Sequence, residues 1–281
     1  MSETFFSVII PTYNRRKWLV DAINSVLSQK YKQFELIVID DGSNDGTSEL
    51  EILKNSRIQY IQKENKGPSS ARNLGAQKAK YDTLAFLDSD DQWLPNKLAE
   101  QAKLFQETDF KASYTDEIWI RNGVRVNQHK HHYKVGGWIY LDCLPLCRIS
   151  PSSIALKKDV FFELGMFNEE FIIAEDYDLW LKLTSKYEIG YIDKKLIKKF
   201  GGHEDQLSKN WGMDINRVKS LEWMLRNGDL KDEWRKETYL SLMKRLEILI
   251  KGFEKHGKHE EMGVFKSLKE EWSQIEVNKS C

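Results

Sequence analysis

The sequence lacks the features that would set it apart from ordinary globular proteins. It has only three cysteines and five prolines in 281 residues, and Lys plus Arg balance Asp plus Glu at 43 each. Zero net charge argues against a nucleic-acid binder that depends on counterion release. Cys143, Cys147 and Cys281 form no CxxC pair and no zinc-ligand spacing. We expect reduced structural thiols, as in cytosolic proteins.

Long apolar runs and the common nucleotide-binding fingerprints are also missing. No apolar stretch approaches the roughly 20 residues that a membrane-spanning helix needs. Met1 leads almost directly into the strand-like run FSVIIP, so no signal peptide is expected. The expected location is cytoplasmic, with the inner face of a membrane as a peripheral alternative. No GxGxxG follows the first strand, which argues against a dinucleotide-dependent dehydrogenase, and no GxxxxGK[ST] occurs, which excludes a P-loop.

What the sequence does contain is an alternation of short apolar runs with helical patterns. Strands are expected over 6–11, 34–40, 58–62 and 83–88, and helices over 15–29, 48–54, 69–80 and from 95 to 105. This alternation predicts βαβ units and therefore a largely parallel sheet with right-handed crossovers. Further strands are expected over 110–120 and 152–158, helices over 159–165 and 175–186, and a loop over 121–137.

The last part of the chain has only helical patterns. Apolar residues recur at steps of three and four, at Tyr239, Leu242, Leu246, Leu249 and Phe253. Such a stripe predicts packing against the rest of the chain or against a second copy of it. We therefore expect an α/β domain over 1–210 and an α-helical extension over 211–281.

Each of the first four strands is followed by a polar cluster. These clusters are PTYNRR, DDGSNDGT, KENKG and LDSDD. The carboxyl ends of parallel strands share one edge of a sheet, and ligands bind in the crevice there. Tyr13, Asp41 and the acids after residue 87 are therefore expected to meet at one site.

Asp88, Asp90 and Asp91 place three carboxylates in four positions, and these repel one another unless a positive charge lies among them. One acid could simply cap the helix that follows. Three acids at the end of a buried strand favour a hard divalent cation, Mn²⁺ or Mg²⁺, held against a diphosphate.

Two long blocks of the sequence resemble family 2 glycosyltransferases of the GT-A fold. They are VIIPTYNRRKWLVDAINSVLSQKYKQFELIVIDDGSNDGT and NKGPSSARNLGAQKAKYDTLAFLDSDD, and the resemblance extends over roughly residues 5 to 210. It implies a Rossmann-like α/β fold, with a mostly parallel mixed sheet flanked by helices. It also implies transfer of a sugar from a nucleotide donor, with inversion at the anomeric carbon. Pro68 departs from the family pattern, which often has a second glycine there.

The resemblance also implies roles for individual residues. Pro11, Tyr13 and Asp41 would hold the nucleotide base, Thr12 would belong to the nucleotide-sugar site, and Arg72 would lie near the donor. Asp88 and Asp90 would contact ribose, sugar or metal, Asp91 would be the metal ligand, and His203 would approach the diphosphate or the metal. The segment FNEEFIIAEDYDLWLKL resembles the one that supplies the catalytic base, which places that role on Asp176.

The base assignment also has support from the residues alone. Glu175 and Asp176 open an amphipathic helix, where acids favour the helix dipole without any catalytic role. An inverting displacement, however, needs a carboxylate that faces the acceptor and is separate from the metal acids. Asp176 meets this requirement, and Glu175, Asp178 and Glu169 are the weaker candidates.

Two other functions compete with the transferase. FLDSDDQ resembles the DxDx[TV] loop of haloacid-dehalogenase phosphohydrolases, but Gln92 stands where Thr or Val is required. A catalytically silent nucleotide-sugar-binding module is the other alternative, although the acids are intact. A UDP-sugar is the expected donor because a tyrosine face and an aspartate acceptor suit the uracil imide.

The expected partners follow from this interpretation. They are a nucleotide sugar and a saccharide, lipid-linked or protein acceptor that residues 121–150 recognise, but no nucleic acid. A homodimer through the C-terminal helices is left open. Lys194, Lys195, Lys198 and Lys199 could meet a membrane, but an exposed strand face is the favoured interpretation.

Overall fold

The N-terminal half of the sheet consists of four parallel strands. The computed structural model describes residues 3–128, 132–202 and 212–279. In it, β1 (Phe6–Thr12) lies between β2 (Phe34–Asp40) and β4 (Thr83–Phe86), and β3 (Ile58–Gln62) flanks β2. These strands match the predicted ones, and the ladders among the four are all parallel. Their carboxyl ends therefore meet at one edge, as the polar clusters required.

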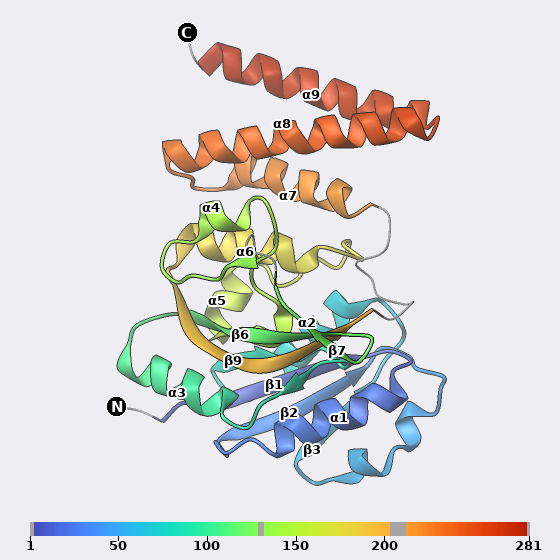
Figure 1. The fold of residues 1–281 in the computed structure, drawn as a ribbon, viewed down its shortest axis with the longest axis vertical. Helices are drawn as coiled ribbons and strands as arrows, with labels where there is room; N and C mark the ends of the chain where they lie inside the picture. Colours follow the sequence, from blue (N-terminus) through green and yellow to red (C-terminus); the bar gives the residue numbers. More distant parts are fainter. Residues whose placement is uncertain (1–2, 129–131, 203–211, 280–281) are drawn as a thin grey trace.

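The other half of the sheet is mixed. β8 (Ala155–Lys157) pairs antiparallel with both β4 and β6 (Ala112–Arg121), so it joins the two halves. The long β9 (Ile189–Gly201) runs parallel to β6, and the short β5 (Gln92–Trp93) closes the edge. The order is β3-β2-β1-β4-β8-β6-β9-β5, and β7 (Val124–Val126) forms a hairpin with β6 (Figure 1). This confirms the mixed α/β class.

Helices cover both faces of the sheet because successive strand residues point to opposite sides. Val8 and Ile10 face α1 (Arg16–Leu27) and α3 (Lys97–Glu107) in one core, whereas Ile9 belongs to a second core. That second core contains α2 (Pro68–Lys78), α5 (Lys158–Glu163) and α6 (Glu175–Lys186). Gly75 lets α2 lie directly on β1, since a Cβ there would come within 2.4 Å of the Ile9 side chain.

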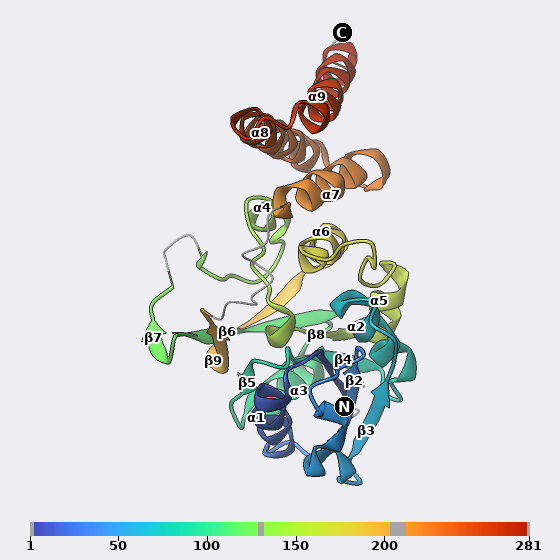
Figure 2. The ribbon, with the colours of Figure 1, turned by 90° about the vertical axis from the view of Figure 1, so that its right-hand side faces the viewer.

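Three helices follow the α/β region and stack beyond α6 (Figures 1 and 2). They are α7 (Met213–Asn227), α8 (Asp232–Lys255) and α9 (His259–Lys279). α7 packs on α6, and α8 reaches the short α4 (Tyr140–Cys143) through a hydrogen bond between the Tyr140 and Thr238 hydroxyls. The predicted apolar stripe is buried at Leu242, Leu246, Leu249 and Phe253. The core continues from α6 into these helices, so a domain boundary at residue 210 stays a prediction.

Three segments differ from the sequence-based expectation. The helix expected near 48–54 is a pair of 3₁₀ turns, Thr47–Glu49 and Glu51–Lys54. The loop expected over 121–137 contains β7, and the strand β9 was not recognised as an element of the sheet. In the described part of the chain, no helix is long and apolar enough to cross a membrane.

Candidate active site

A cavity of about 890 Å³ opens at the carboxyl ends of β1, β2 and β4. It is lined by nine of the ten predicted site residues: Pro11, Thr12, Tyr13, Asp41, Arg72, Asp88, Asp90, Asp91 and Asp176. The tenth, His203, lies outside the described residues. Residues from α2, β6, β9, α6, α7 and the segment 147–151 also contribute to the lining. The structure thus brings together segments that are about 200 residues apart in the sequence, from Pro11 to Arg217.

The loops after β1 and β2 are fastened to each other at the rim of the cavity. Asn14 has a left-handed backbone with φ of 51°, which asparagine tolerates better than most residues. Its side-chain oxygen accepts a hydrogen bond from the Asn44 amide at 2.9 Å, and its own amide donates to the Ser43 hydroxyl at 2.9 Å. These bonds fix the adjacent Tyr13, whose side chain remains 47% exposed at the cavity mouth.

Asp41 is held by the loop that follows β3. One carboxylate oxygen accepts from the Lys63 ammonium and from the Lys66 amide at 3.0 Å, and the other accepts from the Gly67 amide at 2.7 Å. Asp41 is 3% exposed, so it is fixed in place before any ligand arrives. The neighbouring Asp40 has a different task, because its carboxylate accepts from the Tyr60 hydroxyl at 2.6 Å.

Arg72 connects the acids after β4 to the first turn of α6. Its guanidinium donates to Asp88 Oδ1 at 2.7 Å and to Glu175 Oε1 at 2.8 Å. Burial alone would lower the pKa of Arg72, but these two carboxylates raise it. Burial outweighs the attraction of Arg72 at Glu175 and raises the pKa of that carboxyl to about 7. Because its Oε1 already accepts from Arg72, Glu175 is engaged in holding this guanidinium.

Asp91 lies at the floor of the cavity with 2% exposure. Its Oδ2 accepts from the Ser152 hydroxyl at 2.6 Å and its Oδ1 from the Phe200 amide at 2.9 Å. Burial, reinforced by Asp90, raises the pKa of Asp91 well above its usual range, although Lys199 opposes this shift. A nearby cation would stabilise the charged form of such a carboxylate.

The acids of the cavity fit a divalent cation only if the bound substrate supplies further oxygen ligands. Within residues 3–128, 132–202 and 212–279, no group of three His, Cys, Asp or Glu side chains is placed to hold a metal ion. Mg²⁺ and similar hard ions are often held by one or two carboxylates together with waters and substrate phosphates. Asp91 and Asp90, both at the cavity, suit this arrangement, in which the ligand completes the oxygen shell.

Asp176 faces the cavity from the start of α6. The preceding Ala174 has a left-handed backbone with φ of 62°, and this turn begins the helix. One Asp176 oxygen accepts from the Tyr177 amide at 2.7 Å and the other from the Cys147 thiol at 3.3 Å. Burial and the Asp176 charge raise the pKa of Cys147 well above its usual range, so the thiol keeps its proton.

The weaker base candidates are engaged elsewhere. Asp178 forms an ion pair with Lys182 at 2.6 Å, and Glu169 accepts from the Asn73 amide group at 3.0 Å. Asp176 has no ion pair with any residue that the structure describes. Among the acids of this segment, it is the one whose charge is available to a ligand in the cavity.

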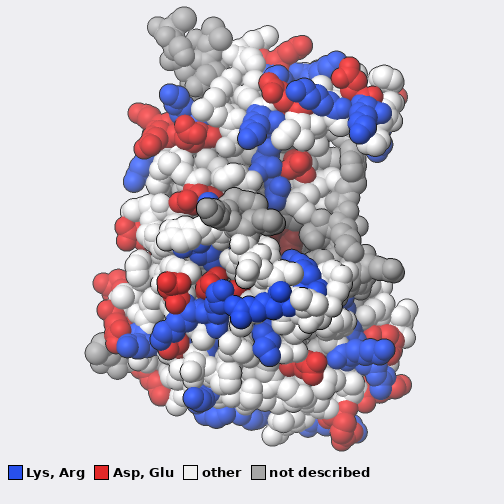
Figure 3. Space-filling view, viewed as in Figure 1, with Lys and Arg blue, Asp and Glu red and all other residues white. Residues whose placement is uncertain are grey.

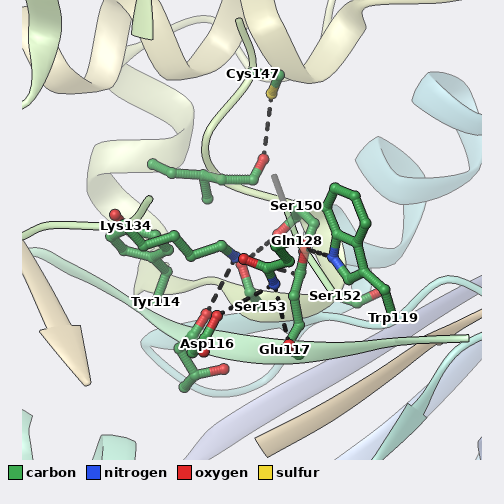
Figure 4. A network of polar contacts seen from close by, with 12 residues as sticks. Tyr114, Asp116, Glu117, Trp119, Gln128, Lys134, Cys147, Ser150, Ser152 and Ser153 are labelled. Atoms are coloured by element: carbon green, nitrogen blue, oxygen red, sulfur yellow. Dashed lines mark hydrogen bonds and ion pairs between the residues drawn. The ribbon is translucent and has the colours of Figure 1, made fainter. Parts of the chain in front are cut away.

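The opposite wall of the cavity was not predicted. Its centre is Glu117 on β6, which accepts from the Trp119 indole at 2.8 Å and the Ser150 hydroxyl at 2.7 Å, and which pairs with Lys134 at 3.3 Å (Figure 4). Burial would raise the pKa of Glu117, but Lys134 and then Lys199 lower it to about 2. This carboxylate is therefore charged and fully engaged.

The interpretation of the four lysines as an exposed strand face is wrong for Lys199. Lys194 and Lys195 are exposed on β9, and Figure 3 shows a band of basic side chains across the middle of one face of the molecule. Lys199, however, lines the cavity and is opposite Trp119 in the β6–β9 ladder. Strand alternation was the missed signal, since it puts Lys199 on the same face as the buried Ile197.

A comparison with known proteins agrees with these observations. A model of the family described as "Glycosyl transferase family 2" matches residues 7–164. An uncharacterized glycosyltransferase of Rickettsia conorii, RC0461, is 39% identical over 200 residues, which are 70% of this chain. The chain spans about a third of the length of this relative and of the next two similar rickettsial proteins.

Two further similar proteins align with this chain over a larger share of both chains. The Escherichia coli protein named UDP-Glc:alpha-D-GlcNAc-diphosphoundecaprenol beta-1,3-glucosyltransferase WfgD is 29% identical over 260 residues, 91% of this chain and 96% of its own. The crystal structure of S. aureus TarS 1–349 in complex with UDP-GlcNAc has a TM-score of 0.69 at 24% identity. The match covers 86% of this chain and 72% of the TarS 1–349 chain, and this likeness confirms the predicted GT-A fold.

Proposed function

Because the chain belongs to glycosyl transferase family 2 and is thus a glycosyltransferase, we propose that it transfers a sugar from a UDP-sugar to a lipid-linked saccharide with inversion. The observation that carries this proposal is the single cavity shared by Tyr13, Asp41, the acids after β4 and Asp176. These groups come from four separate segments. Their common purpose is easiest to explain by one ligand that extends along the cavity and reaches all of them.

The donor assignment is supported by the rim of the cavity. Tyr13 presents an exposed ring for a base to stack on, and Asp41 is a fixed acceptor beside it. A carboxylate oxygen that accepts from backbone amides keeps a lone pair for the imide of uracil. TarS, which shares the fold, has been solved with UDP and with UDP-GlcNAc.

The acceptor assignment is supported by apolar side chains of the cavity and by the relatives. Ile172, 69% exposed, and Met213 line the cavity together with Arg217 of α7. WfgD and WfaP, the latter 34% identical over 189 residues, are both named for acceptors on diphosphoundecaprenol. A lipid-linked acceptor would bring the protein to a membrane surface.

The proposed reaction has one displacement step. The acceptor hydroxyl oxygen forms a bond to the anomeric carbon while the bond from that carbon to the diphosphate oxygen breaks, and the electron pair stays on the diphosphate. The hydroxyl proton passes to the Asp176 carboxylate, which the thiol of Cys147 and the Tyr177 amide orient. A Mn²⁺ or Mg²⁺ ion held by Asp91 and Asp90 would neutralise charge on the diphosphate.

A nucleotide panel followed by a product assay tests this function. Thermal unfolding would be measured with UDP and GDP, each with and without Mn²⁺, because a ligand of the folded state raises the unfolding temperature. We expect the largest rise with UDP plus Mn²⁺, and release of UDP from a UDP-sugar when a diphosphate-linked acceptor is added. A larger rise with GDP would refute the donor, and nucleotide binding without any turnover would support a silent module instead.

A further inference from the structure

Lys199 occupies an unusual position among the acids of the cavity. It lies near the end of β9, and the next residue, Phe200, donates its amide to Asp91 Oδ1 at 2.9 Å. This bond fixes the end of the strand against the acids after β4. Lys199 is partly buried and lines the cavity.

The neighbouring strand shows which way Lys199 faces. Glu117, Trp119 and Arg121 alternate along one face of β6, and all of them line the cavity. Lys199 is opposite Trp119 in this parallel ladder, so the two side chains share that face. Lys198, one residue earlier, is paired with Ile118 and points to the other side.

The acids around Lys199 already have other partners. Glu117 is bonded to Lys134, Trp119 and Ser150, Asp88 to Arg72, and Asp91 to Ser152 and Phe200. The Lys199 ammonium forms no hydrogen bond or ion pair with the residues that the structure describes. Nevertheless, Glu117, Asp91, Asp88 and Asp176 all raise its pKa against the effect of burial, so the ammonium stays charged.

A charged ammonium with free donors is costly to keep partly buried unless a ligand meets it. The acids near Lys199 are those expected beside the diphosphate, Asp88 and Asp91, and the proposed base, Asp176. An anion that Lys199 binds near these acids would therefore lie close to the bond between the sugar and the diphosphate, which breaks in the reaction. A lysine is a common point-charge ligand of phosphate.

We propose that Lys199 binds the diphosphate of the nucleotide-sugar donor and stabilises the negative charge that develops on it when the sugar leaves. This inference rests on the proposed function. Lys199 keeps its proton throughout, because the electron pair of the breaking bond stays on the diphosphate and the acceptor proton goes to Asp176. The chain thereby supplies a cation of its own for the leaving group, and part of the affinity for UDP should persist without a divalent ion.

The test compares UDP with uridine in the absence of metal. Both would be titrated calorimetrically in EDTA into the wild type and into Lys199→Met, Lys199→Arg and Lys198→Met. A lost charge-assisted bond is expected to weaken UDP binding by Lys199→Met about 10-fold to 100-fold. Uridine, which has no phosphate, should bind all four proteins equally. Lys199→Arg should retain most of the UDP affinity, and the matched control Lys198→Met all of it.

The outcomes separate this inference from the proposed function. Equal UDP affinity for Lys199→Met and the wild type would overturn the role of Lys199 and leave the transferase intact. A loss of uridine affinity equal to the loss for UDP would also overturn it, since the effect would then be structural. If the wild type bound UDP neither in EDTA nor with Mn²⁺, the proposed donor itself would fail.

Discussion

The two walls of the cavity are built in different ways. On the first wall, the acids after β2 and β4 accept hydrogen bonds from backbone amides, a hydroxyl and the cations Lys63 and Arg72, and Asp41 for example accepts from the Lys66 and Gly67 amides. On the second wall, Glu117, Lys134 and Lys199 come from β6, the segment after β7, and β9; Lys134 pairs with Glu117, and Lys199 acts on it through its charge. The acids of the first wall follow the parallel strands directly in the sequence, whereas the charged residues of the second wall come from three separate segments.

This difference assigns different tasks to the walls. A carboxylate fixed by amides keeps lone pairs for a ligand and suits recognition of the base. On the second wall, the opposite charges of Glu117, Lys134 and Lys199 favour one another's ionised forms although these groups are buried or partly buried. Such a wall suits a site that must hold a diphosphate. Asp176, on α6, lines the same cavity and is the proposed base, so its loss should affect turnover more than donor binding.

The largest effect is expected for Asp176→Asn. This change keeps the size and hydrogen bonding of the side chain but removes the group that takes the acceptor proton. Turnover should fall by roughly 10²–10⁴-fold, while UDP affinity in the presence of Mn²⁺ stays near that of the wild type. The exposed Glu170→Gln is the control in the same segment. Near-wild-type turnover would assign the base elsewhere, first to Glu175 or Asp178.

A smaller effect, on stability, is expected for Glu117→Gln. The folded-state pKa of Glu117 is about 2, below its ordinary value of 4.5, so its ionised form stabilises the fold above pH 4.5. The variant should lose roughly 3 kcal/mol of unfolding free energy at pH 7, at 1.36 kcal/mol per pH unit. The gap should close as the pH falls from 4.5 toward 2.

Urea unfolding of both proteins across this pH range measures the effect. Glu64→Gln, a change at an exposed site, is the control and should stay within about 0.5 kcal/mol of the wild type. A gap of constant size down to pH 2 would show that the second wall is not held by the charge of Glu117.

The smallest effect is expected for Asp41→Asn on the first wall. The asparagine side chain has one acceptor atom instead of two and carries no charge. The uracil should therefore lose one charge-assisted hydrogen bond, and UDP affinity should fall about 10-fold. In contrast to Lys199→Met, the loss should be the same for uridine as for UDP, with or without metal. Calorimetric titration of both ligands distinguishes the walls, and an unchanged uridine affinity would remove Asp41 from base recognition.

The first wall could be predicted from the sequence because its signals are local. Strand, polar cluster and helix follow one another within about 30 residues, and parallel order then places Tyr13, Asp41 and Asp91 at one edge. The second wall could not be predicted, because its residues meet only through the β6–β9 ladder, which joins positions about 80 residues apart. Lys199 was misassigned for this reason, and Glu117 and Lys134 gave no local signal at all.

The most direct test of the account is a crystal structure of the protein with UDP and Mn²⁺. The account predicts uracil on the Tyr13 ring with its imide toward Asp41, and the diphosphate between Asp91 on the first wall and Lys199 on the second. The terminal phosphate should point to the side where Asp176 lies. A diphosphate that contacts neither Asp91 nor Lys199 would contradict the division of tasks between the two walls.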